Sequence, residues 1–195
     1  MSKAQYQYRQ FKDDESIRIL TLEPGRYDDP LIGRLEVVPI DSPGSYEALS
    51  YVWTDAALPK STYEILIRDG DDEEVLLAFD GGSIFAALRS IRRSTLPRRI
   101  WADQCSINQK VRVERSQQVK FMNRIYRDAT QILVWLGLDT HKVASSAFGL
   151  VHDLDRILGC PSSDPGTHLE MYIADKRKPL QALTNRPWVS LWRDT

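Results

Sequence analysis

The sequence predicts an α/β protein with a mainly parallel sheet flanked by helices. One observation is a pair of apolar runs, residues 100–103 and 131–136, of the kind that form strands buried on both faces. The other is the segment between them, whose inward stripe recurs every three or four residues, as one face of a helix requires. That stripe comprises Arg115, Gln118, Val119, Met122, Ile125, Tyr126 and Ala129. Strand, helix and strand therefore form a right-handed βαβ crossover.

The residues that precede the crossover predict two antiparallel hairpins and a further strand. Residues 1–15 are polar and predict a flexible lead-in. Residues 16–22 alternate apolar side chains and stop at Pro24-Gly25, and they predict an antiparallel pair with residues 34–40, an N-terminal hairpin. Residues 46–53 predict a central strand.

A second hairpin and two helices complete the expected elements. Residues 62–68 and 74–79 flank an acidic turn and predict the second β-hairpin. The apolar spacing of Ile84, Leu88 and Ile91 predicts a helix that ends before Pro97. After the crossover, residues 143–158 predict an amphipathic helix that Gly159 ends.

Composition limits the classes of function. The chain has 195 residues, 42% of them hydrophobic and 27% charged, which fits one soluble domain over residues 16–195. A formal net charge of −1 gives no general attraction to nucleic acid, and no apolar run reaches membrane-spanning length. Two distant cysteines without a signal-like start favour a reducing, cytoplasmic location. No histidine or cysteine pair has zinc-type spacing, so no metal is expected.

Polar residues gather where two of the predicted strands end. Asp103 and the loop after it leave one strand, and Ser50, Tyr51 and Trp53 end the central strand. Open α/β sheets bind ligands at the carboxyl ends of their parallel strands, so these residues predict a shared crevice. The inward stripe of the helix also begins with polar rather than aliphatic side chains. The alternative is structural: capping and turn hydrogen bonds from the polar groups, and packing by the aromatic rings.

Three segments together resemble the fungal heterokaryon incompatibility (HET) domain. They are Tyr-Glu-Ala-Leu-Ser-Tyr-Val-Trp at 46–53, Trp-Ala-Asp-Gln-Cys-Ser-Ile-Asn-Gln at 101–109 with the pattern that runs on to Trp135-Leu136-Gly137, and Arg186-Pro187-Trp188. The resemblance implies an intracellular effector of non-self recognition that triggers regulated cell death. HET domains are distantly similar to Toll/interleukin-receptor (TIR) domains, which implies a flavodoxin-like sheet, and some TIR domains cleave NAD.

The resemblance therefore suggests an enzyme that hydrolyses NAD at its nicotinamide glycosidic bond, with NAD as substrate and no cofactor. Glu114 and Asp103 are the catalytic candidates in that case. The residues expected to bind substrate or shape the site are Ser50, Tyr51, Trp53, Cys105, Asn108, Gln109, Arg115, Gln118, Arg186 and Trp188. A non-catalytic module that signals by self-association, or by contact with other death-signalling proteins, is the competing hypothesis.

Two further expectations concern Cys105 and the end of the chain. A Cys105 nucleophile is a third and weaker idea, since a buried structural thiol fits its surroundings better. HET domains usually continue past a second Trp to a Gln-Glu pair, whereas here Trp192 is followed by Arg193-Asp194-Thr195. We therefore expect the domain to be truncated at its C-terminal end.

Overall fold

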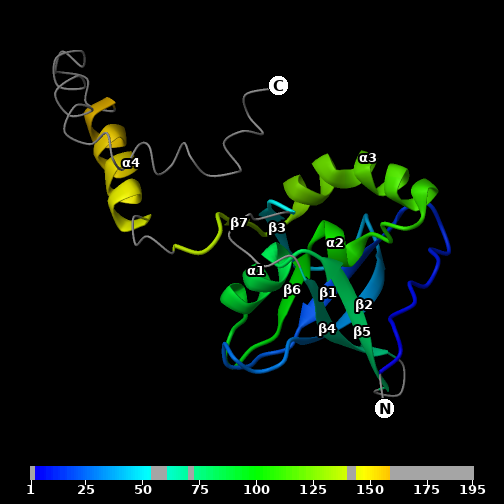
Figure 1. Cartoon of the computed structure of the whole chain (residues 1–195). Coiled ribbons are helices and arrows are strands. Elements are labelled where there is room, and N and C mark those ends of the chain that lie inside the picture. The colour runs from blue at the N-terminus through cyan, green and yellow to red at the C-terminus, as the bar shows by residue number, and fades with distance from the viewer. Residues whose placement is uncertain (1–2, 54–60, 70–72, 140–143, 159–195) are drawn as a thin grey trace. The chain divides into compact units, whose positions relative to one another are not determined.

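The computed structural model describes residues 3–53, 61–69, 73–139 and 144–158, which contain seven strands and four helices (Figure 1). The elements are β1 (Ser16–Leu22), β2 (Ile32–Pro39), β3 (Glu47–Tyr51), β4 (Thr62–Asp69), β5 (Glu73–Asp80), α1 (Ser83–Ile91), β6 (Arg98–Trp101), α2 (Asp103–Ser106), α3 (Arg112–Asp128), β7 (Gln131–Trp135) and α4 (Ala144–Leu158).

The chain forms two compact units, Met1–Gly137 and Leu138–Thr195. The first contains the whole sheet, and the second contains α4, which matches the helix predicted at residues 143–158. The expected single domain over 16–195 stays a prediction. None of the helices in the described part of the chain has the length and apolar composition that a membrane crossing requires.

The seven strands form one mixed sheet in the order β5-β4-β2-β1-β6-β3-β7. Both predicted hairpins are confirmed, since β1 pairs antiparallel with β2 and β4 pairs antiparallel with β5. The strand β3 runs parallel to both β6 and β7, as the crossover requires. However, β1 pairs antiparallel with β6, so only three of the six pairings in the described residues are parallel. The predicted α/β class is confirmed, but the sheet is mixed rather than mainly parallel, because the N-terminal hairpin enters its middle.

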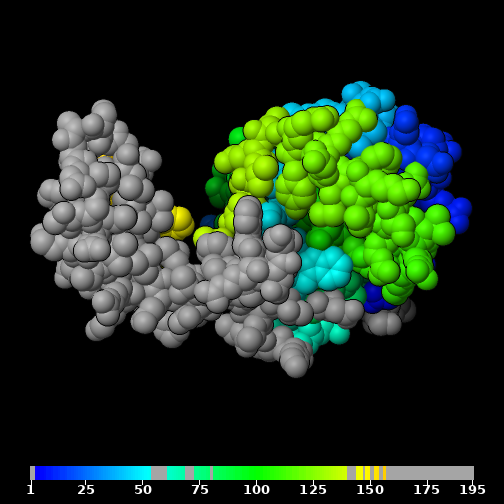
Figure 2. Space-filling model, turned by 90° about the horizontal axis from the view of Figure 1, so that it is seen from above, coloured from blue at the N-terminus to red at the C-terminus, as the bar shows by residue number. Residues whose placement is uncertain are grey.

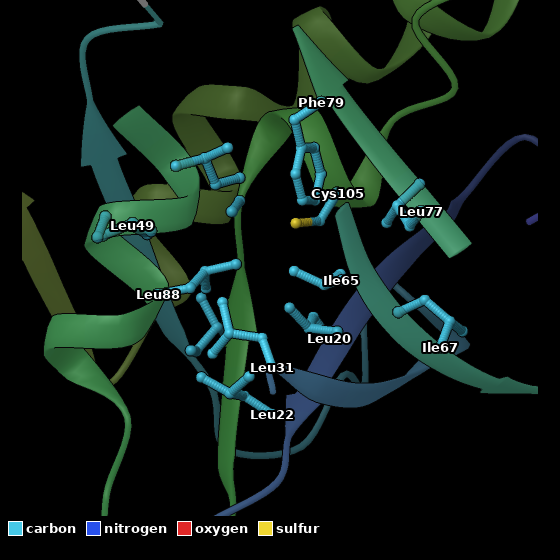
Figure 3. Packing of buried hydrophobic residues seen from close by; sticks show 14 residues of the cluster. Leu20, Leu22, Leu31, Leu49, Ile65, Ile67, Leu77, Phe79, Leu88 and Cys105 are labelled. Carbon is cyan, nitrogen blue, oxygen red and sulfur yellow. The ribbon is translucent and has the colours of Figure 1, made fainter. Parts of the chain in front are cut away.

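Each face of the sheet has its own apolar core. On one face, residues of α1 pack against side chains from several strands (Figure 3). That cluster includes Leu20, Leu22, Leu31, Leu49, Ile65, Ile67, Leu77, Phe79, Leu88 and Cys105. On the other face, Ile125 of α3 packs with Ile17, Ile19 and Trp101. The strand β1 is buried on both faces because it lies between these two cores.

The strand β7 was predicted to be buried on both faces, but in the structure one of its faces is exposed. It lies at one end of the strand order, next to β3. Leu133 and Trp135 pack against the first core, whereas Ile132 is 48% exposed and Val134 is 63% exposed. An apolar run alone does not distinguish a central strand from one at the end of a sheet.

The segment around Asp103 also differs from its prediction. The strand β6 begins at Arg98 and ends at Trp101, so Asp103 is not part of it. Asp103 is instead the first residue of the short helix α2, where a polar loop was expected. Its carboxylate accepts a hydrogen bond from the Gln104 backbone N–H at 2.7 Å, and carboxylates are favoured in the first turn of a helix.

The inward face of α3 is rotated relative to the predicted stripe. Gln118 and Ile125 are its buried residues, and the Glu114 side chain is 11% exposed. Arg115 is exposed and Val119 is 53% exposed, so these two do not face the sheet as predicted. Glu114 and Gln118 are four residues apart, one helical turn, which places both on the face that packs on β1.

The segment expected as a flexible lead-in is hydrogen-bonded to β5 within the first unit. The Tyr6 backbone N–H donates to the Leu76 carbonyl oxygen at 2.7 Å, and the Leu76 N–H donates to the Ala4 carbonyl at 2.8 Å. Leu76 belongs to β5, the strand at the other end of the order from β7. Residues 3–6 therefore lie along an end strand of the sheet.

Candidate functional site

Two parallel neighbouring strands bring the predicted residues together. Because β3 and β6 run in the same direction, their carboxyl ends meet at one edge of the sheet, at the top of Figure 1. Tyr51 is the last residue of β3, Trp53 lies two residues beyond it, and Asp103 follows β6. The helix α3 lies along the same edge, and its yellow-green surface covers much of this unit in Figure 2. The carboxyl ends of β3 and β6 therefore lie side by side, as predicted.

The Asp103 carboxylate is the centre of this meeting. Its Oδ1 accepts hydrogen bonds from the Tyr51 hydroxyl at 2.6 Å and from the Gln104 N–H. Its Oδ2 accepts one from the Trp53 indole N–H at 2.6 Å. A carboxylate can accept about four hydrogen bonds, so Asp103 keeps capacity for one more donor. The group is held from three directions in a fixed orientation.

The aromatic partners of Asp103 have different exposures. Trp53 is 44% exposed, and its ring orientation is fixed because its N–H is bound to Asp103. Burial, with the nearby Asp103 charge, raises the pKa of the Tyr51 hydroxyl well above its ordinary value. Tyr51 therefore stays a hydrogen-bond donor at neutral pH. A partly exposed indole beside a fixed carboxylate provides a stacking surface and an anion at one place.

Ser50 and Tyr126 flank this centre. The Tyr126 hydroxyl of α3 donates to the Leu49 carbonyl at 3.2 Å and interacts with the Ser50 side chain. Burial is the main cause that raises the pKa of Tyr126 to about 12, and the Asp103 charge adds to it. The sequence predicted only a packing role for Tyr126, which follows the buried residue Ile125. In the structure its hydroxyl also reaches the end of β3, at the Leu49 carbonyl.

Cys105 lies in α2, two residues after Asp103, and is fully buried. Burial raises the pKa of its thiol, and the negative charge of Asp103 raises it further. A thiol must ionise to act as a nucleophile, and this environment opposes ionisation. The geometry therefore favours the structural interpretation of Cys105 over the nucleophilic one.

Glu114 belongs to a second polar cluster, built around Arg18 of β1. Its Oε1 lies 2.5 Å from Arg18 Nη1, and its Oε2 lies 3.2 Å from Arg18 Nη2. The same Oε1 accepts the Asn108 backbone N–H at 2.7 Å. Arg18 is 1% exposed, so this is a buried, two-point ion pair. The carboxylate of Glu114 is thus engaged by protein groups on both oxygens.

The remaining predicted residues near Glu114 shape the loop between α2 and α3. Gln118 donates from Nε2 to the Ser16 carbonyl at 2.8 Å, which ties α3 to the start of β1. Gln109 donates from Nε2 to the Asp103 carbonyl at 3.0 Å. Asn108 accepts the Lys110 N–H on its side-chain oxygen at 3.2 Å, a turn contact. Arg115 is exposed and lies on another face of α3.

Sequence reasoning missed Arg18. It lies between Ile17 and Ile19 in a strand whose faces are both covered. A charged residue inside an apolar run was the available signal, because such a residue must find a partner if the run is buried.

Arg186 and Trp188, also predicted for the site, lie outside the described residues. Within the described residues, no group of three or more His, Cys, Asp or Glu side chains could hold a metal ion.

Comparison with known proteins gives two matches. Residues 46–192 match the family model described as heterokaryon incompatibility protein (HET). The chain is 38% identical over 129 residues to heterokaryon incompatibility protein 6, OR allele, of Neurospora crassa. That alignment covers 62% of this chain and 18% of the relative, so the chain spans less than a fifth of that protein's length. No solved structure matches the chain.

Proposed function

The chain belongs to the heterokaryon incompatibility (HET) family, and on that premise we propose that it is a cytoplasmic effector domain of fungal non-self recognition, whose activation triggers regulated cell death. The meeting at Asp103 is the observation that carries the proposal. Tyr51, Trp53 and Asp103 all lie inside the family-matched region, and hydrogen bonds of 2.6 Å join them at one edge of the sheet. Packing alone does not require a carboxylate that holds a partly exposed indole.

The proposed activity is hydrolysis of NAD or a related nucleotide. The bond between the ribose C1′ and the nicotinamide nitrogen breaks, nicotinamide leaves with the electron pair, and water supplies hydroxide to C1′ and a proton to the solvent. Such a reaction passes through an oxocarbenium-like state, which a nearby carboxylate stabilises. The fixed orientation of the Asp103 carboxylate supports that role, and the partly exposed Trp53 ring supports stacking on a base. Glu114 is the second candidate, although Arg18 already binds its carboxylate.

The strand order supports a TIR-like, flavodoxin-like arrangement for part of the sheet. Within the block of adjacent parallel strands β6-β3-β7, β3 comes first in the chain, β6 second and β7 third. A flavodoxin-like sheet begins with the same order, second, first, third, and binds its ligand where the strand order reverses. Here the order reverses between β3 and β7, and the Asp103 group lies at the carboxyl ends of β3 and β6, so the two places share the end of β3.

Nicotinamide release from NAD by the purified chain tests the enzyme proposal. We expect Asp103→Asn to lower the release rate at least tenfold, because the amide cannot stabilise the cationic state. Glu36→Gln is the matched control, since Glu36 on β2 is half exposed and pairs with Arg99, which is not one of the hydrogen-bond partners of the Asp103 carboxylate. No release from this chain, or equal release from the parent and Asp103→Asn, contradicts the assignment of Asp103.

Inducible expression of the chain in a filamentous fungus tests the effector proposal separately. Growth arrest and loss of membrane integrity are expected with the parent chain. Asp103→Asn and Trp53→Ala should reduce the arrest, and Glu36→Gln should preserve it at equal protein level. Normal growth with the parent chain at full expression would count against the effector role, whatever the result with NAD.

Self-association is a second candidate function, favoured by β7. Its sequence, Gln-Ile-Leu-Val-Trp, has no charge, and Ile132 and Val134 are about half exposed. Strands at the end of a sheet commonly carry charged residues that prevent pairing with other chains. Light scattering at increasing concentration tests the idea. We expect the mass to rise with concentration in the parent and not in Val134→Lys, and a monomer at all concentrations contradicts it.

A further inference from the structure

The helix α2, which carries Asp103, has only four residues, and each of its carbonyls lies within hydrogen-bonding distance of a donor. The carbonyls in the last turn of any helix lack partners within it, so a four-residue helix depends on outside donors. Ile107 N–H and the Gln109 side chain donate to the Asp103 carbonyl, each at 3.0 Å. The other three carbonyls lie within hydrogen-bonding distance of two residues from the N-terminal part of the chain, one of which is a hydroxyl that shares its single hydrogen between two carbonyls.

Those two residues are Tyr8 and Arg18. The Tyr8 hydroxyl lies 3.0 Å from the Cys105 carbonyl oxygen and 3.3 Å from that of Gln104. Arg18 Nη1 donates to the Ser106 carbonyl at 3.2 Å. A positive guanidinium at the C-terminal end of a helix also interacts favourably with the helix dipole. Burial raises the pKa of the Tyr8 hydroxyl, so it remains a donor at neutral pH.

Arg18 itself is fixed by a cage that the N-terminal segment closes. Its guanidinium carbon lies 4.0 Å from the centre of the Phe11 ring and 5.0 Å from the centre of the Tyr8 ring. Its Nη2 donates to the Arg9 carbonyl at 2.5 Å, and both terminal nitrogens bind Glu114. A buried cation with this many partners has little freedom to move.

The ends of α2 are therefore connected to different parts of the molecule. At its N-terminal end the Asp103 side chain meets Tyr51 and Trp53, and at its C-terminal end the carbonyls meet Tyr8 and Arg18. A four-residue helix is about 6 Å long, so a change at one end tilts the whole element and moves the carboxylate at the other.

We propose that Tyr8 and Arg18 are positioning residues that set the orientation of the Asp103 carboxylate through α2. Both lie before residue 46, upstream of the family-matched region. The importance of that orientation rests on the proposed function of Asp103, but the positioning itself can be measured without any activity. Glu114 then acts on the site through Arg18 rather than on a substrate.

The test compares Tyr8→Phe with the parent chain by nuclear magnetic resonance. This variant keeps the ring that packs on Arg18 and removes only the hydroxyl that binds α2. Tyr27→Phe is the matched control, because its ring packs on Arg89 in the same manner, at 5.2 Å, and is 53% exposed. Arg18→Lys is the second variant, since lysine keeps the charge but loses the planar fork.

Two signals report the result. The first is amide hydrogen exchange at Cys105, Ser106 and Ile107, whose N–H groups bond within the α2 turn. We expect about a fivefold faster exchange in Tyr8→Phe, the effect of one net hydrogen bond. The second is the indole N–H resonance of Trp53, assigned by its loss in Trp53→Phe. Trp101, whose buried indole nitrogen has no partner among the described residues, serves as the internal reference.

If Tyr8 only stabilises the fold, Tyr8→Phe lowers the unfolding temperature and leaves the native Trp53 resonance unshifted. We expect that resonance to shift in Tyr8→Phe and Arg18→Lys and to stay unchanged in Tyr27→Phe. An unshifted Trp53 signal with unchanged α2 exchange in folded Tyr8→Phe overturns the proposal, as does an equal change in Tyr27→Phe. Loss of activity without either change leaves the proposed function standing and removes the positioning role.

Discussion

Replacing Glu114 by Gln distinguishes a structural carboxylate from a catalytic one. The change keeps the shape of the side chain and removes its charge, which leaves the Arg18 guanidinium buried without a counter-ion. It also places an amide donor opposite an arginine donor, at a site where the Asn108 N–H needs an acceptor as well. The reasoning predicts a large loss of stability.

The size of that loss follows from burial. The Arg18 side chain is 1% exposed and that of Glu114 is 11% exposed. Removing one partner of a buried ion pair lowers the free energy of unfolding by about 3–5 kcal/mol, because the remaining charge stays desolvated. For a chain of this size, each kcal/mol lowers the midpoint of thermal unfolding by about 2–4 °C. We therefore expect a midpoint lower by about 6–20 °C.

Urea unfolding followed by tryptophan fluorescence measures the loss in free energy of unfolding, and thermal unfolding followed by the same signal measures the midpoint. Glu36→Gln is the matched control, because Glu36 and Arg99 form an exposed pair worth about 1 kcal/mol or less. Adding Arg18→Met to Glu114→Gln should recover part of the loss, since neither charge then remains buried alone. A Glu114→Gln chain that matches the parent in stability but lacks activity would refute the structural account and restore Glu114 as a catalytic residue.

Three further outcomes follow from burial and charge. The pKa of Tyr126 is raised to about 12, so its contribution to the free energy of unfolding is intact below pH 10 and falls as the pH rises towards 12. Tyr126→Phe should therefore lose less stability than the parent between pH 10 and 12 in urea unfolding. Arg98 hydrogen-bonds Glu47 and lowers its pKa, so stability present above pH 4.5 is lost on acidification, and Arg98→Met should reduce that loss in an acid titration. In a Cys160→Ser background, iodoacetamide at pH 8 should label Cys105 at least tenfold faster in urea than in buffer, and equal rates contradict its burial.

Local patterns predicted most of the individual elements. The range 16–22 coincides with β1, and the two hairpins and the helices α1, α3 and α4 occur where their patterns indicated. These features depend on residues close in sequence, such as turn residues between alternating runs. The convergence of Tyr51 and Trp53 with Asp103 was also predictable, because it follows from the parallel direction of two neighbouring strands.

The errors arose where distant segments decide the outcome. Whether β7 is covered depends on its neighbours in the sheet, and its own residues are equally apolar in either case. The partner of Glu114 is Arg18, 96 positions away, and no local spacing reveals such a pair. The rotation of α3 that exposes Arg115 and Val119 follows from the same pair, since Glu114 must face β1 to reach Arg18.

The central position of β1 has a consequence for synthesis of the chain. Its partner β2 follows soon after it, but its other partner, β6, begins only at Arg98. At about 5–20 residues per second, the ribosome needs about 4–15 s to add residues 23–97 between them. During that interval one edge of a strand with apolar side chains on both faces has no partner, which exposes the nascent chain to aggregation. Slower elongation within residues 23–97 should therefore lower the yield of folded protein, whereas slower elongation after Trp135 should not.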